Sequence, residues 1–315
     1  MPSRNPRRAL RDNAVQALRG GRAVPTKLVR DTIARIERDR QAQLGKRISI
    51  QRQMAKALGQ ARASAVPGAA PPQAGRAIEN LLRTHKALAK RKIAAPKIPG
   101  GLFDVLPGQI TATIVPPFDY DVIIPTVLAG NEPTLEGASD RNMGRMNVGA
   151  VTAMQRGFNG GSMYTTVGIY FHPPSAGTLR VIAAPVFSFQ WWTNSLDTPH
   201  FVTSSGNLGL TIYGVDLASQ TIGETGTIVS TAGNSFFSWN ETQTAGVHVD
   251  FDFDVQAPVL SAQLDVSRTL VYLLFVEAHV HVHGVGWPGS LAGAKLAVTV
   301  PYLTYDFRIQ QVFEP

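Results

Sequence analysis

The sequence predicts a mainly β protein: an antiparallel β-sandwich or jelly roll preceded by a basic, partly α-helical extension. Two observations predict the sandwich. From residue 101 onward the apolar residues alternate instead of following a helical period, and segments rich in Gly, Pro, Asn and Ser interrupt the chain at short intervals. Charge predicts the extension, because residues 1–100 hold 23 Lys/Arg and 5 Asp/Glu, whereas residues 101–315 hold 7 and 17. The net charge of +8 therefore divides into +18 and −10.

Composition excludes several classes of site. The 315 residues include no cysteine, which rules out disulfides, thiolate zinc sites and a cysteine nucleophile. No run of 18 apolar residues predicts a transmembrane helix, and the N-terminus lacks the apolar core of a secretory signal. Neither observation assigns a compartment. No nucleophile–base pair, Walker motif or HExxH motif occurs, so no catalytic residue is predicted.

Residues 1–100 are expected to form a basic arm of helices and linkers. A helix begins after Pro25, where Val29, Ile33 and Ile36 form a narrow apolar stripe, and further helical patterns cover 46–62 and 76–92. Linkers rich in Pro, Gly and Ala lie near 64–75 and 93–101. The arm is expected to bind nucleic acid or another polyanion, or to tether neighbouring subunits. Its candidate polyanion-binding residues are Arg4, Arg7, Arg8, Arg11, Arg19, Arg22, Lys46, Arg47, Lys90, Arg91 and Lys92.

The second domain, 101–315, is expected to hold about ten strands. Alternation predicts them at 109–114, 120–128, 147–154, 163–171, 179–192, 208–215, 227–231, 235–241, 247–256, 270–283 and 295–308. Turns are expected between them, including the glycine-rich stretches that begin at Phe158, Ser204 and Ser230. In 247–256, Val247 and Phe251 are expected on a buried face and Asp250, Asp252 and Asp254 on a wet one. Those carboxylates are spread too widely along a straight strand for all three to bind one calcium ion.

One strand, 270–284, carries the most specific candidate site. Its first half is apolar on both faces, as expected of a central strand, while Glu277, His279, His281 and His283 share one face of its second half. Two histidines at alternate positions are able to chelate zinc or copper, and this pair superficially resembles the His-x-His strands of carbonic-anhydrase-like and cupin-like sites. Catalytic zinc needs a third protein ligand, which only His172, His200 or His248 could supply. The alternative is a polar strand end at a rim of the sheet that titrates near pH 6–7.

Two tryptophans suggest a sugar-binding site as an alternative to the metal site. Trp192 and Trp287 are candidate platforms for stacking against a sugar, and packing in a core or subunit interface is the competing interpretation.

A basic arm followed by an acidic β-sandwich resembles the coat proteins of small icosahedral viruses, at the level of architecture and without a shared motif. The resemblance implies a jelly-roll shell and an arm facing packaged nucleic acid, in a virion or the cytoplasm. The first hypothesis is therefore a non-enzymatic, self-assembling structural protein, a homo-oligomer without a cofactor. The alternatives are a glycan- or surface-binding, lectin-like sandwich with a basic anchor, and a metal-binding protein that uses His279, His281 and His283.

Overall fold

The computed structural model describes Asp31, Ile33, Ala34, Arg38 and residues 109–129, 133–153, 157–195, 201–216, 227–286 and 290–309. From residue 109 onward the described residues form fourteen strands in three sheets, and every strand pair is antiparallel. The mainly β, antiparallel prediction is confirmed. Asp31, Ile33, Ala34 and Arg38 have helical backbone, and the rest of the predicted arm lies outside the described residues.

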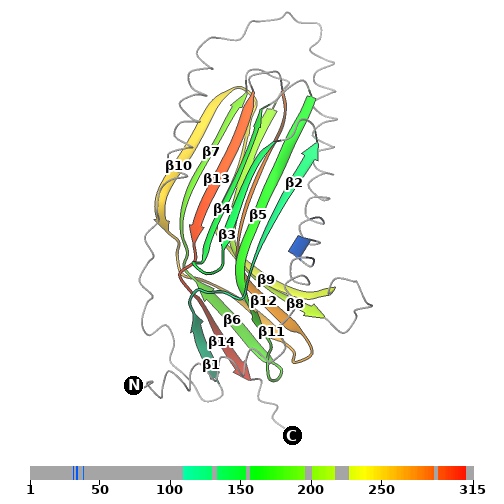
Figure 1. Cartoon of the computed structure of the whole chain (residues 1–315), viewed down its shortest axis with the longest axis vertical. Helices are drawn as coiled ribbons and strands as arrows, with labels where there is room; N and C mark the ends of the chain where they lie inside the picture. The colour runs from blue at the N-terminus through cyan, green and yellow to red at the C-terminus, as the bar shows by residue number, and fades with distance from the viewer. Residues whose placement is uncertain are drawn as a thin grey trace, which may run out of the picture.

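One layer is a five-stranded sheet of long strands, which we call sheet B (Figure 1). The predicted central strand lies in its middle, hydrogen-bonded on both sides, because its first half is apolar on both faces. In spatial order the strands are β2 (Tyr120–Ala129), β5 (Gly157–Phe171), β12 (Val271–Gly286), β8 (Phe201–Asp216) and β9 (Thr227–Gln243).

The opposite layer is divided into two sheets. Sheet C occupies the upper part of Figure 1 and comprises, in order, β10 (Gly246–Gln256), β7 (Val186–Ser195), β13 (Leu291–Thr299), β4 (Arg145–Ala153) and β3 (Thr134–Asp140). Sheet A lies below it and comprises β1 (Gln109–Ile114), β14 (Leu303–Ile309), β6 (Gly177–Ala183) and β11 (Leu260–Val266).

Sheets C and A continue one another through three short connections. The chain passes from β6 to β7, from β10 to β11 and from β13 to β14 within two or three residues, and the order of these strands is the same in both sheets. Each connection contains a proline, namely Pro185, Pro258 and Pro301. Because proline has no N–H to donate to a ladder, the three prolines interrupt the hydrogen bonding along one line across the layer.

The strand pairing is nested. The first strand of the series, β4, pairs with β13; β5 pairs with β12; β7 and β6 pair with β10 and β11; and β8 pairs with β9. Two further pairs, β13 with β7 and β12 with β8, join these hairpins into the two layers. The chain is thus a long antiparallel hairpin that is rolled onto itself.

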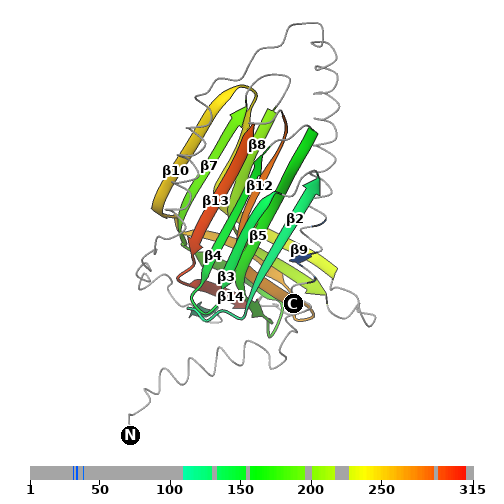
Figure 2. The ribbon, with the colours of Figure 1, turned by 45° about the horizontal axis from the view of Figure 1, so that its top comes forward.

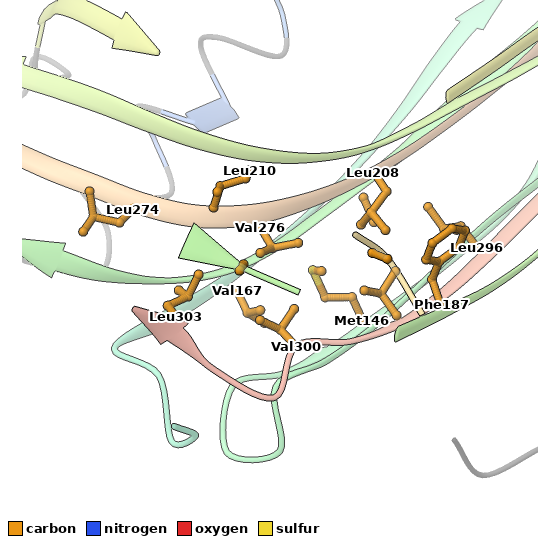
Figure 3. Packing of buried hydrophobic residues seen from close by; sticks show 14 of the residues in the cluster. Met146, Val167, Phe187, Leu208, Leu210, Leu274, Val276, Leu296, Val300 and Leu303 are labelled. Carbon is orange, nitrogen blue, oxygen red and sulfur yellow. The ribbon is translucent and has the colours of Figure 1, made fainter. Parts of the chain in front are cut away.

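A single large core fills the space between the layers (Figure 3). Val276 and Leu208 of sheet B meet Met146 and Leu296 of sheet C there, while Leu303 contributes from sheet A. Burial of each such side chain stabilises the fold by about 1.5–3 kcal/mol. Figure 2 shows sheet C lying across sheet B, with the long strands of sheet B extending below it.

Two predicted strands, 179–192 and 295–308, are each wrong as a single element. Each is divided between sheet C and sheet A, because Pro185 and Pro301 interrupt the backbone ladder inside stretches that are rich in apolar residues.

Three predicted turns are also wrong. The stretches beginning at Phe158, Ser204 and Ser230 lie within β5, β8 and β9, and the predicted strands 227–231 and 235–241 form one strand. Glycine is used here for close approach, since a Cβ at Gly160 would collide with His283 on the neighbouring strand. Strands β3 and β11 were not predicted at all.

Candidate functional site

Strand β12 divides into an apolar face and a polar face, as its alternation predicts. Ala278, Val280 and Val282 are fully buried in the core between the layers. Glu277, His279, His281 and His283 project from the opposite, outer face of sheet B. The partners directly opposite these four residues on β5 and β8 extend the polar character across the sheet: Thr166, Tyr164, Ser162 and Gly160 on β5, and Gly209, Asn207, Ser205 and Thr203 on β8.

A buried carboxylate anchors this polar face. Glu277 is buried, and its Oε2 accepts a 2.9 Å hydrogen bond from the Tyr164 hydroxyl, while its Oε1 accepts one of 3.2 Å from the Thr211 hydroxyl. Hydrogen bonds to a charged group stabilise by about 1.5–3 kcal/mol each. The network therefore fixes the relative positions of three strands, β5, β12 and β8.

His281 and His283 form a buried pair rather than an exposed rim. Their side chains are 2% and 5% exposed, and His281 Nε2 lies 2.8 Å from His283 Nδ1. Burial lowers the pKa of His283 to about 4, and burial together with the neighbouring His283 and His279 lowers the pKa of His281 well below 6.5. The expectation of an accessible strand end that titrates near pH 6–7 is wrong for these two residues, because removal of water disfavours the imidazolium.

Among the described residues, the histidines that could complete a metal site do not form a metal-binding group with this pair. His248 lies on β10, with its Nδ1 3.2 Å from Glu241 Oε1 and its ring edge-on to Trp191. His172 follows β5, and His200 lies outside the described residues. Within the part of the chain that the structure describes, no three or more His, Asp or Glu side chains are grouped closely enough to hold a metal ion. Zinc or copper binding by His279, His281 and His283 stays a prediction.

Trp192 is an interior residue. Its ring is fully buried and packs over Gly293 on the neighbouring strand β13, where any Cβ would overlap it. This position agrees with packing and not with an exposed sugar platform. Trp287, the other candidate for stacking, lies outside the described residues.

The carboxylate strand β10 is an edge strand, and its apolar face is more exposed to solvent than predicted. Asp250, Asp252 and Asp254 are exposed as expected, but Val247 and Phe251 are about half exposed, 49% and 51%. The expectation of one fully buried face is wrong because β10 pairs only with β7 and lies at the margin of sheet C.

Lys295 and Gln190 form a buried polar row that the sequence analysis missed. They lie opposite each other on β13 and β7, 7% and 1% exposed. Lys295 Nζ is 3.7 Å from Glu136 Oε2, whereas neither amide atom of Gln190 has a hydrogen-bond partner among the described residues. A lysine inside the otherwise apolar strand LAGAKLAVT was the available signal.

All eleven candidate polyanion-binding residues, Arg4 to Lys92, lie outside the described residues. Among the described residues, no helix is long and apolar enough to cross a membrane.

No protein-family model matches the chain, and no curated protein matches it. Similar solved structures include the K1 adhesin domain of Lys-gingipain from Porphyromonas gingivalis, with 8% identity over 64% of this chain and 99% of that chain and a TM-score of 0.20. The VP2 subviral particle of infectious bursal disease virus has 12% identity over 69% of this chain and 42% of that chain, with a TM-score of 0.19. The structure of CBM4 has 5% identity over 51% of this chain and 77% of that chain, with a TM-score of 0.17. TM-scores this low assign neither family nor function.

Proposed function

We propose that the chain is a non-enzymatic, self-assembling shell protein whose body is a jelly roll and whose basic residues 1–100 bind nucleic acid or another polyanion. The observation that carries the proposal is the nested pairing of β4 with β13, β5 with β12, β6–β7 with β10–β11, and β8 with β9. Eight antiparallel strands in two layers, rolled in this way, are the arrangement of jelly-roll domains, which recur in viral capsids.

Charge supplies the second support. A segment of net +18 joined to a body of net −10 separates a polyanion-binding region from a surface that does not attract polyanions. Such a segment neutralises phosphates and releases counterions, so it binds without reading sequence.

Exposed apolar side chains support subunit contacts. On the described surface they include Ile123 and Val127 on β2 and Val247 and Phe251 on β10, and both strands lie at edges of their sheets. Apolar edge strands are where further copies of a β protein associate.

The test is assembly of the full-length protein. We expect a large homo-oligomer by light scattering and closed particles by negative-stain electron microscopy, with bound nucleic acid at low salt. A protein that stays monomeric at high concentration, with and without nucleic acid, contradicts the proposal.

A matched pair of variants tests the role of the arm. R7Q/R8Q removes two arginines from the arm, and R268Q/R308Q removes two exposed arginines from the body. The arm variant should lower the slope of log affinity for nucleic acid against log salt by about 2. The body variant should leave that slope unchanged, and equal effects would refute an arm-specific role.

A further inference from the structure

Ile33 is the largest apolar side chain described from the N-terminal region, and it is fully buried against the body. It is 1% exposed and belongs to a second hydrophobic cluster, separate from the main core. That cluster is made of side chains on the outer face of sheet B: Tyr120, Val122, Tyr164, Tyr213, Val215, Leu273 and Phe275. Figures 1 and 2 show the blue helical segment beside this sheet. Ile33 is also the central residue of the predicted apolar stripe Val29, Ile33 and Ile36.

The outer face and the segment have complementary charge. Residues 26–40 hold five Lys/Arg and three Asp/Glu. The face that receives Ile33 carries the buried Glu277, and Asp119 and Asp216 lie beside it, directly before β2 and at the end of β8. Opposite charges around an apolar contact favour the pairing of these two surfaces and fix its orientation.

The covalent connection is long enough for the segment to reach beyond its own body. Seventy residues, 39–108, separate Arg38 from β1, and they include both Pro- and Gly-rich linkers. Fully extended, such a connection spans up to about 230 Å. The radius of gyration expected of a body of this size is only about 17 Å. The outer face of a neighbouring copy is therefore within reach.

We propose that the segment around Ile33 is exchanged between copies, so that in the assembled protein it docks on the outer face of sheet B of a neighbour. This inference rests on the self-assembly proposed above and names the contact that links the copies. Exchange of an identical element costs little, because each copy keeps the same contacts that it makes within one chain. Assembly places the neighbour's face at a high effective concentration.

The absence of cysteine makes the exchange measurable. Arg38 is exposed, so R38C provides a single attachment point for a benzophenone label close to Ile33 without replacing it. Equal amounts of ¹⁵N-labelled and unlabelled full-length protein are mixed, assembled and irradiated. We expect crosslinks from position 38 to β2, β8 and β12, about half of which join a heavy chain to a light one. The exchange is refuted if no crosslink joins a heavy chain to a light one, or if position 38 crosslinks only to strands other than β2, β8 and β12.

A pair of isoleucine variants separates docking from general loss of stability. I33D places a charge in the buried cluster, whereas I309D places the same charge at a residue that is 43% exposed. I33D should abolish the crosslinks and convert assemblies into smaller species, while I309D should change neither. Assembly and crosslinking by I33D at the level of I309D contradict the proposal.

The two proposals fail in different ways. A wild-type protein that stays monomeric by light scattering refutes shell formation and, with it, the exchange. A wild-type assembly whose crosslinks all join chains of one mass refutes the exchange alone.

Discussion

His281 Nε2 lies 2.8 Å from His283 Nδ1 inside the buried outer face of sheet B. A hydrogen bond between two imidazoles needs one nitrogen that donates and one that accepts, and two neutral rings satisfy this requirement. When both rings are protonated, two N–H donors face each other. The contact therefore stabilises the uncharged pair, in agreement with the lowered pKa of each residue.

The first prediction is a loss of stability in mild acid. The unfolded chain takes up a proton at each histidine near pH 6.5, while folded His283 does so only near pH 4. Stability should be constant above about pH 7 and should fall as the pH decreases to about 4, by about 3 kcal/mol for His283 alone. Urea unfolding at pH 7.5, 6, 5 and 4 measures this loss. H281N/H283N should flatten the profile and the exposed H248Q should not, and an unchanged profile in the double variant would contradict the assignment.

The second prediction concerns Tyr164 and Glu277. Y164F removes the hydroxyl that donates to the buried carboxylate and should lower the free energy of unfolding by about 1.5–3 kcal/mol. E277Q keeps the shape but removes the charge. A double-mutant cycle should give a coupling free energy of at least ~0.5 kcal/mol, because the residues are in direct contact. Strict additivity would show that the hydrogen bond contributes nothing.

The third prediction compares two glycines on neighbouring strands of sheet C. G293A puts a methyl group into the buried Trp192 ring, which has no space to move, and should cost about 1–3 kcal/mol. G149A meets its nearest atom at 3.5 Å, an ordinary contact, and should cost less. Thermal unfolding of the two variants tests the difference. If W192L restores stability in the G293A background, the clash with the Trp192 ring causes the loss. Equal losses of stability in G293A and G149A would refute this explanation.

The fourth prediction compares two phenylalanines. F187A removes a core side chain and should destabilise by about 3–5 kcal/mol. F251A, at a half-exposed position on the edge strand β10, should cost about 1 kcal/mol or less. Denaturant midpoints distinguish the two, and a loss at Phe251 equal to that at Phe187 would mean that β10 has a covered face.

Periodicity predicted the strands with a clear alternation of apolar and polar residues well. The strand at 109–114 was predicted with its observed bounds, and β10 and the alternation of β12 follow directly from the order of apolar and polar residues. These successes share a cause, since each strand has one apolar and one polar face for at least part of its length.

Sheet membership was not predictable from the same pattern. Apolar residues flank Pro185 and Pro301 on both sides, and a single sequence does not distinguish a kink within one sheet from a passage between two sheets. The turn predictions that relied on glycine were wrong for a related reason. Gly160 and Gly206 lie in strands because neighbouring side chains, His283 and Trp239, occupy the space that a Cβ would need.

The polar face of β12 was predicted, but its burial was not. Alternation shows that His281 and His283 share a face with Glu277, but not which other part of the protein covers that face. The contact between Ile33 and Phe275, more than two hundred residues apart in sequence, shows that distant parts of the chain cover another part of the same face.

The nested strand pairing also constrains the synthesis of the protein. In sheet C, β4 pairs with β13, whose residues lie about 150 positions further along the chain, so this sheet is incomplete until β13 has left the ribosome. Such long-range closure is slow, and unpaired strands remain open to wrong partners until it occurs. Residues 1–100, with their charge of +18, emerge before residues 101–315 and are exposed before the body has closed. Under the function proposed above, the order of synthesis would let the arm bind a polyanion before the subunits assemble.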